Sequence, residues 1–151
     1  MRIYLGSDHR GFQLKEKIKR WLTDTQPAVV DLGNAVYDPE DDFPDFAFAV
    51  ASRVAGSDDV GILLCGSGGM ALVANKVRGI RAVEVSDERR AAHAKSDDHA
   101  NIIALPADEV SFGQATKIIS AWLDASPKRD RKYLRRLRKI EALERMVFKA
   151  E

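Results

Sequence analysis

Apolar residues at the start of the chain occur first as a short continuous run and then at helical spacing. Residues 2–5 form an apolar and aromatic run that stops at Gly6-Ser7-Asp8, after which Leu14, Ile18 and Leu22 recur at intervals of four. Short runs bounded by turn residues are typical of strands, and spacing of three or four is typical of one helix face. The segment therefore predicts a strand, a loop and a helix.

The same alternation repeats through residues 28–123. Further strands are expected at 28–32, 61–65, 80–85 and 101–105, and further helices at 46–54, 70–77, after an N-cap at Ser86, and at 112–123. The run 61–65 is uniformly apolar, which is the pattern of a parallel strand covered on both faces. Strands alternating with helices predict an α/β fold, a three-layer sandwich around a five-stranded parallel sheet.

The last quarter of the chain is rich in Arg and Lys and predicts a basic helix over residues 128–150. Tyr133, Leu137, Ile140 and Val147 lie on one stripe of this helix. We interpret the stripe as packing on its own domain or on a partner subunit, with most charges solvated. The alternative is that one or two of the arginines bind an anion. The helix would extend beyond the sheet of a single domain spanning residues 1–151.

Composition excludes several function classes. Lys and Arg total 24 and Asp and Glu 23, so a formal charge of +1 provides no global field for nucleic acid or an anionic membrane. The single cysteine excludes an intramolecular disulfide, and no leader or long apolar run is evident. We therefore expect a cytoplasmic protein.

The strongest candidate for chemistry is the loop 65–70, Cys-Gly-Ser-Gly-Gly-Met, at the end of the most apolar strand. Ligands of parallel sheets bind at the carboxyl ends of strands, and small residues let a ligand approach backbone amides. Such amides stabilise an oxyanion or a phosphate. Cys65 beside a helix start favours a thiolate, which can act as a base. The alternative is a buried cysteine that only packs.

Two polar clusters accompany this loop. Asp8-His9 ends the first strand and is expected to project into the same crevice. Asp97-Asp98-His99 precedes the fifth strand and supplies an acid or a base, or is an ordinary polar loop. No cluster has metal-ligand spacing, so no metal and no cofactor is expected.

Several segments together resemble one family. They are Gly6-Ser7-Asp8-His9-Arg10-Gly11-Phe12, the acidic stretch 37–44, Cys65-Gly66-Ser67-Gly68, Ala74-Asn75-Lys76 and Gly79-Ile80-Arg81-Ala82. Over essentially its whole length the chain resembles the ribose-5-phosphate isomerase B and galactose-6-phosphate isomerase subunit family. The resemblance implies a Rossmann-like sandwich with an extended C-terminal helix, in homodimers or homotetramers whose active sites are shared between subunits.

The resemblance also implies an enzyme, a metal-free sugar-phosphate aldose–ketose isomerase that acts through an enediolate, typically on ribose 5-phosphate and ribulose 5-phosphate. Cys65 matches the base. Asp8 would bind sugar hydroxyls or help to open the ring, and His9 would face the phosphate across the subunit boundary. The oxyanion-stabilising loop would consist of Gly66, Ser67, Gly68 and Gly69.

At the C-terminal side, Arg136 matches a phosphate-binding arginine and Lys132 stands in the place of another. Asp97 takes the position of the ring-opening histidine and Asp98 that of the asparagine after it, unless a two-residue shift gives the role to His99. Three further departures from the family pattern are Glu109 in place of an arginine, Phe43 in place of a tyrosine, and a glycine loop one residue shorter.

Three hypotheses follow. The first is an isomerase of a pentose phosphate, because the base, the amide loop and the Asp-His pair are all present. The second keeps the reaction and changes the sugar to a tetrose or hexose phosphate. The third is a non-catalytic sugar-phosphate-binding protein, motivated by Asp97 and Glu109.

Overall fold

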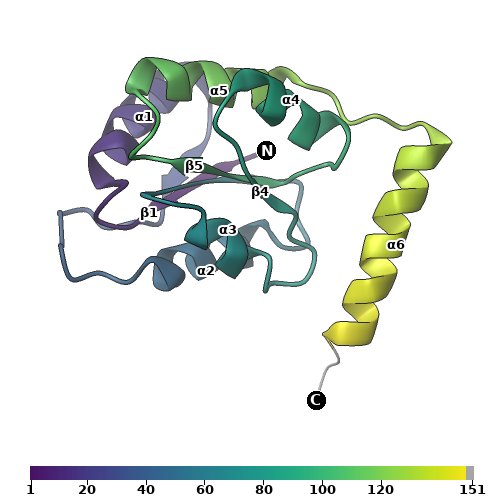
Figure 1. Cartoon of the computed structure of the whole chain (residues 1–151). Coiled ribbons are helices and arrows are strands. Elements are labelled where there is room, and N and C mark those ends of the chain that lie inside the picture. Colours follow the sequence, from purple (N-terminus) through teal and green to yellow (C-terminus); the bar gives the residue numbers. More distant parts are fainter. Residues whose placement is uncertain (149–151) are drawn as a thin grey trace.

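The computed structural model describes residues 1–148, in which one sheet lies between two layers of helices (Figure 1). The strands are β1 (Ile3–Ser7), β2 (Val29–Asp31), β3 (Val60–Cys65), β4 (Ala82–Glu84) and β5 (Ile102–Pro106). The helices are α1 (Phe12–Thr25), α2 (Phe43–Val54), α3 (Gly69–Ala74), α4 (Glu88–Ser96), α5 (Phe112–Asp124) and α6 (Arg131–Val147). The strand order is β2-β1-β3-β5-β4, and all neighbours run parallel. The predicted five-stranded α/β sandwich with a C-terminal helix is confirmed.

The bounds of some elements differ from the prediction. Helix α2 begins at Phe43, before its predicted start, because Pro44 fits the first turn of a helix, where its missing N–H is not needed. The N-cap of α4 is Asp87 and not Ser86, and the Asp87 carboxylate accepts a hydrogen bond of 2.8 Å from the backbone N–H of Arg90. Helix α6 is shorter than the predicted 128–150, and residues 149 and 150 lie outside the described part of the chain.

Side chains alternate between two cores, one on each face of the sheet. Helices α1, α4 and α5 cover one face, and α2 and α3 cover the other (Figure 1). Strand β3 is buried along its entire length, as the uniformly apolar run predicts. Its last residue, Cys65, belongs to the face covered by α2 and α3. The cysteine therefore stands at the carboxyl end of the central strand, shortly before the start of α3 at Gly69.

The turn between β1 and α1 packs tightly against β3. A Cβ atom added to Gly11 would lie 2.2 Å from the backbone oxygen of Leu64, a contact that only glycine avoids. Because this packing brings the turn close to β3, residues 8–10 lie beside the end of the strand that carries Cys65. The sheet order, with β1 next to β3, makes the convergence possible.

A buried ion network joins α1 to β2 and to the loop that follows it. The side chain of Lys15 is fully buried, and its Nζ donates to Asp31 Oδ2 at 2.6 Å, to Glu16 at 3.0 Å and to the Asn34 carbonyl at 2.9 Å. Lys19 shares the Asp31 carboxylate at 2.9 Å. Buried charges require such partners, so the network fixes the start of the loop over residues 32–42.

Helix α6 stands apart from the two helical layers (Figure 1). None of its residues is buried, and Ile140, Leu143, Met146 and Val147 are exposed apolar residues along it. One hydrogen bond of 3.1 Å links Glu144 Oε1 to the backbone N–H of Gly79. The apolar stripe predicted for this helix therefore remains largely uncovered within one protomer. None of the helices within residues 1–148 is both long and apolar enough to cross a membrane.

Candidate active site

A cavity of about 360 Å³ opens at the carboxyl ends of β1 and β3. Its lining comprises Asp8, His9, Arg10, Phe43, Cys65, Gly66, Ser67 and Gly69. Small-molecule sites typically occupy such concave spaces, from about 300 Å³ upward. The structure thus brings together six of the residues that the sequence singled out, from two loops that are more than fifty positions apart.

Cys65 is only 4% exposed, yet it borders this cavity. Its thiol donates a hydrogen bond to the Ser67 carbonyl. Burial raises the pKa of the Cys65 thiol, and the charges of Asp8 and Glu84 add to this rise. Backbone hydrogen bonds from Met70 and Ser67 act in the opposite direction, as predicted for the start of a helix. Burial outweighs them, so the pKa of the Cys65 thiol lies above its ordinary value.

Glycines in the loop after Cys65 allow two charged side chains to lie directly on it. A Cβ atom on Gly66 would lie 2.4 Å from the guanidinium carbon of Arg10. One on Gly68 would overlap the carboxylate of Glu84 at the end of β4. The loop therefore presents its backbone between a cation and an anion.

His9 is held by Asp41, a residue of the acidic stretch before α2. Oδ1 of Asp41 lies 2.7 Å from Nδ1 of His9 and accepts a second bond, 2.9 Å long, from the His9 backbone N–H. The side-chain hydrogen bond between Nδ1 and Asp41 raises the pKa of His9, and the charge of Asp8 adds to this rise. Partial burial of the ring and the charge of Arg10 lower the pKa. Asp8 itself is 6% exposed and accepts a hydrogen bond of 3.1 Å from the Gly11 N–H.

Arg10 and Asp41 are contributors to which the sequence analysis assigned no role. The Arg10 guanidinium lines the cavity and pairs with Asp108 of the loop after β5. One signal for Arg10 was available, because Gly11 marks a tight turn that places its three preceding residues at the strand end. Nothing in the sequence distinguishes Asp41 from the other acids around it.

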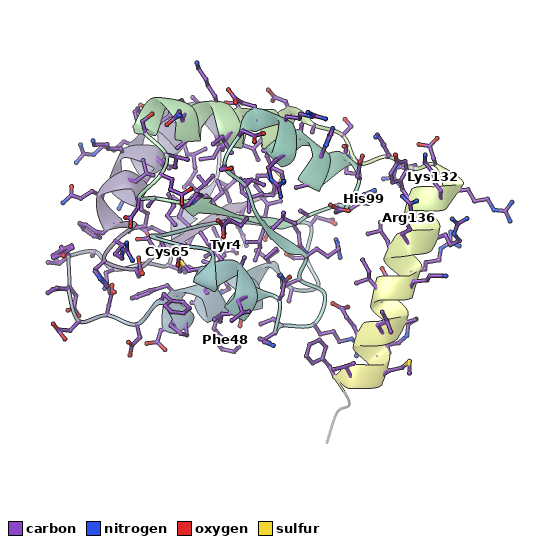
Figure 2. All side chains as sticks on the ribbon, viewed as in Figure 1. Tyr4, Phe48, Cys65, His99, Lys132 and Arg136 are labelled. Carbon is purple, nitrogen blue, oxygen red and sulfur yellow. The ribbon has the colours of Figure 1, made fainter. Side chains whose placement is uncertain are left out.

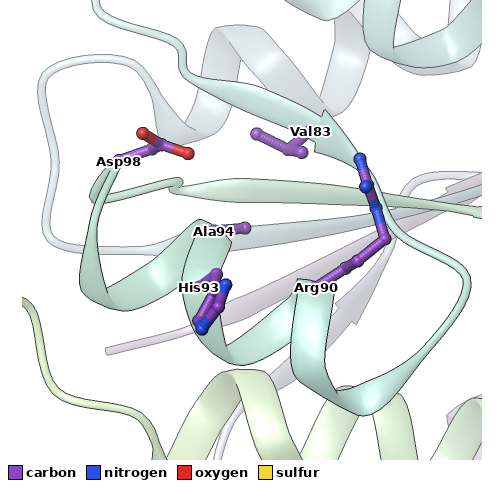
Figure 3. A pocket seen from close by; sticks show the side chains of 5 residues that line it. All are labelled: Val83, Arg90, His93, Ala94 and Asp98. Atoms are coloured by element: carbon purple, nitrogen blue, oxygen red, sulfur yellow. The ribbon is translucent and has the colours of Figure 1, made fainter.

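The remaining predicted residues form a second cluster between α4 and α6. Asp97, Asp98 and Arg136 share the lining of a cavity of about 320 Å³. Lys128 Nζ lies 2.7 Å from Asp97 Oδ1, and the Ser96 hydroxyl donates to the same oxygen. Hydrogen bonds from Lys128 and then Ser96 lower the pKa of Asp97. Asp98 and His93, which also line that cavity, line a smaller pocket together with Arg90 (Figure 3).

His99 and Lys132 belong to the same side of the molecule. Nε2 of His99 lies 2.8 Å from the Lys128 carbonyl, and the His99 backbone has a positive φ of 50°. Lys132 Nζ and the Arg136 guanidinium lie 5.0 Å and 5.7 Å from the centre of the Tyr133 ring. Figure 2 shows these three labelled residues on the side of the molecule away from Cys65. Within one protomer, the predicted site is therefore divided into two parts.

The described residues 1–148 contain no group of three or more His, Cys, Asp or Glu side chains placed to hold a metal ion. The Cys65 cavity instead offers a thiol, a carboxylate, an imidazole, a guanidinium and loop amides. These groups suit proton transfer on a small anionic substrate.

Comparison with known proteins places this arrangement among the sugar-phosphate aldose–ketose isomerases. The sequence profile of the Ribose/Galactose Isomerase family matches residues 3–140, and the chain belongs to that family. The solved structure of ribose-5-phosphate isomerase B from Mycoplasma genitalium with bound ribulose-5-phosphate is 41% identical, with a TM-score of 0.91 over 95% of this chain and 96% of that one.

Two further relatives carry names that specify different substrates. Ribose-5-phosphate isomerase B of Mycobacterium tuberculosis is 35% identical over 96% of this chain and 91% of its own length. D-erythrulose-4-phosphate isomerase of Pectobacterium atrosepticum is 40% identical over 82% of both chains. The family resemblance inferred from the motifs is confirmed. The relatives differ in the sugar phosphate that their names specify.

The buried position of Cys65 predicts a slow, pH-dependent reaction with an alkylating reagent. Since the pKa of the thiol is raised, the rate with iodoacetamide should keep increasing above the usual cysteine pKa of about 8.5. Cys65 is the only cysteine, so mass spectrometry of the labelled protein reports this site alone. Cys65→Ser serves as the blank. A rate that reaches its plateau below pH 8 would contradict the raised pKa.

Proposed function

We propose that this protein interconverts ribose 5-phosphate and ribulose 5-phosphate through an enediolate, with Cys65 as the base and without a metal. The observation that carries the proposal is the thiol at the end of β3, which opens onto a cavity beside the amide-rich loop 66–69. The relative of known structure from Mycoplasma genitalium is described with bound ribulose-5-phosphate. Its similarity over nearly the whole chain supports the choice of pentose.

In the proposed reaction, the Cys65 thiolate removes the proton from C2 of the open-chain aldose. The electron pair moves toward the C1 carbonyl and forms an enediolate. The Cys65 thiol then protonates C1 while the proton of the C2 hydroxyl passes to the C1 oxygen, which gives the ketose. Amides of residues 66–69 would stabilise the negative oxygen during this step. A raised thiol pKa lowers the thiolate fraction at neutral pH but makes each thiolate a stronger base toward a carbon acid.

Two side chains at the end of β1 would bind the substrate in this cavity. The Asp8 carboxylate, held by the Gly11 N–H, would accept hydrogen bonds from sugar hydroxyls. His9, held at Nδ1 by Asp41, would bind the phosphate. These roles rest on the cavity lining and on the family resemblance.

The second cluster would complete the site of another copy of the chain. Asp97, Asp98, His99, Lys132 and Arg136 lie away from the cavity of their own protomer. Helix α6 has no buried residue. In the layer formed by α2 and α3, Phe48 is 59% exposed and Leu72 is 65% exposed. Apolar surfaces of this kind mark association sites. We therefore propose a homodimer, or a tetramer of two such dimers, in which α6 packs on the partner subunit and brings Arg136 and Lys132 to the substrate phosphate.

A tetrose phosphate is the second candidate substrate. It is supported by the 40% identity to the D-erythrulose-4-phosphate isomerase of Pectobacterium atrosepticum. Phe43 lines the cavity and contributes no hydroxyl group to it, so the lining does not require the extra hydroxyl of a pentose. The cytoplasmic location remains a prediction from the sequence.

The first test measures isomerisation of ribose 5-phosphate, erythrulose 4-phosphate and a hexose 6-phosphate, with and without EDTA. Ribose 5-phosphate should have the highest kcat/KM, and EDTA should change nothing. Cys65→Ser should lose about 10³-fold in kcat, since an alcohol is a far poorer base than a thiolate. Its circular dichroism should match that of the parent protein. A preference for the tetrose phosphate would make it, and not ribose 5-phosphate, the substrate. Binding of ribose 5-phosphate without solvent-proton exchange at C2 would favour a non-catalytic protein.

A second test compares the two candidates for ring opening. The lowered pKa of Asp97 keeps it an anion at neutral pH. In His99, Nε2 is bonded to the Lys128 carbonyl, so Nδ1 is the ring nitrogen that would contact the sugar. We expect His99→Asn to reduce kcat by about 10²-fold and Asp97→Asn by much less. Rates with rapidly ring-opening substrates should differ less between the two variants. The reverse order would assign the role to Asp97.

A third test uses complementation between inactive chains. Cys65→Ser and Arg136→Ala damage different halves of the proposed site, so a mixed dimer carries one site with both defects and one site with neither. After mixing under conditions of subunit exchange, activity should rise to about a quarter of the parent value, because half of the dimers are mixed. Two separately inactive proteins that stay inactive after verified exchange would show that one protomer supplies the whole site.

A further inference from the structure

We propose that Asp41 is a positioning residue for His9, holding Nδ1 of the imidazole so that Nε2 is presented to the anionic group of the substrate. The inference rests on the proposed sugar-phosphate substrate of the Cys65 cavity. It adds a residue from the loop before α2, outside the cavity lining, to the binding of the phosphate.

Burial and hydrogen bonds fix the position of the Asp41 carboxylate. Its side chain is 5% exposed, and both of its oxygens are occupied. Oδ1 takes the backbone N–H of His9 at 2.9 Å and faces Nδ1 at 2.7 Å, while Oδ2 accepts from Asn34 Nδ2 at 3.0 Å. Two contacts to the same residue fix the orientation of the ring as well as its backbone. Because a carboxylate can only accept, Nδ1 carries the proton and Nε2 remains for a ligand.

The carboxylate is itself held by the buried network of α1 and β2. Lys15, with no exposed side-chain surface, donates to the Asn34 carbonyl at 2.9 Å and to Asp31 at 2.6 Å. The other oxygen of Asp31 accepts the Gly33 N–H at 2.9 Å. Lys15 thus holds the backbone of Asn34, and the Asn34 side chain holds Asp41, which contacts His9. Outer partners of this kind orient functional histidines.

The groups facing His9 determine its charge. Asp41 and Asp8 favour the imidazolium, Arg10 opposes it, and the ring edge of Tyr37 packs at 6.5 Å between ring centres. Cys65 faces it across the cavity as a neutral thiol. The hydrogen bond to Asp41 is the largest cause of the raised pKa of His9. Since the imidazolium binds a phosphate dianion and the neutral ring does so weakly, affinity is present below this pKa and is lost as the pH rises through it.

Other acids of the same stretch lack this contact. The Asp38 carboxylate accepts the backbone N–H of Glu40 at 3.0 Å, and the Glu40 side chain is exposed. Glu40→Gln therefore removes one negative charge from the same loop without touching His9. It is the matched control for Asp41→Asn, which keeps the size of the side chain and removes its charge.

The first measurement needs no substrate. NMR titration of the imidazole signals should show a lower His9 pKa in Asp41→Asn than in the parent protein, and an unchanged one in Glu40→Gln. Titration with inorganic phosphate should show weaker binding by Asp41→Asn alone. An unchanged His9 pKa in Asp41→Asn would overturn the proposal, whatever the activity of the enzyme.

The second measurement uses turnover of the preferred sugar phosphate. Loss of a charge-assisted contact to phosphate should raise KM by about tenfold and leave kcat within about threefold in Asp41→Asn. The alkaline fall of 1/KM should move to lower pH, and Asp41→Glu should restore part of the shift. A loss confined to kcat, or a KM equal to that of Glu40→Gln, would overturn the proposal.

Two further results separate this inference from the proposed function and from misfolding. Asn34→Ala, which removes only the donor to Oδ2, should change the His9 pKa and KM in the same direction by a smaller factor. If no sugar phosphate is turned over by the parent protein, the proposed function fails, while the NMR and phosphate titrations still decide the role of Asp41.

Discussion

The close approach of the β1–α1 turn to β3 is the constraint on which the candidate site depends. Gly11 lies so near the backbone of Leu64 that no side chain fits between them. The contact is between main chains, and side-chain rearrangement cannot relieve it. It places Asp8, His9 and Arg10 beside Cys65, although nearly sixty residues separate them along the chain. The thiol and the groups proposed to bind the substrate therefore come together through backbone packing.

Charge is distributed over this site in opposing pairs. Arg10 lies on Gly66 and pairs with Asp108, while Glu84 lies on Gly68. Asp8 and Glu84 oppose ionisation of Cys65, whereas Asp8 and Asp41 favour the cationic form of His9. The Asp8 carboxylate thus raises the pKa of both Cys65, the proposed base, and His9, the proposed phosphate ligand. An enediolate reaction at neutral pH benefits from both effects, provided that enough thiolate forms.

The sequence predicts most of the fold, because the evidence for it is local. The apolar run 61–65 predicts a strand buried on both faces, and the strand is found there. The convergence of Asp8-His9 with Cys65 follows from the rule that ligands bind at the carboxyl ends of parallel strands. Asp41 and Arg10 were not assigned roles, since their contacts join residues 32 and 98 positions apart. No periodicity in a sequence reports such pairs. The raised pKa of Cys65 was also missed, because it depends on burial and on Glu84 from another strand.

The separation of Cys65 from His99 and Arg136 within one copy has a consequence for the cell. Under the proposed assembly, a correctly folded monomer has no activity, and turnover begins only when two copies associate. At abundances below the dissociation constant, the population of paired copies grows with the square of the copy number. Halving expression would then remove about three quarters of the output, so gene dosage would act on this step more steeply than on an enzyme whose site is complete in one chain.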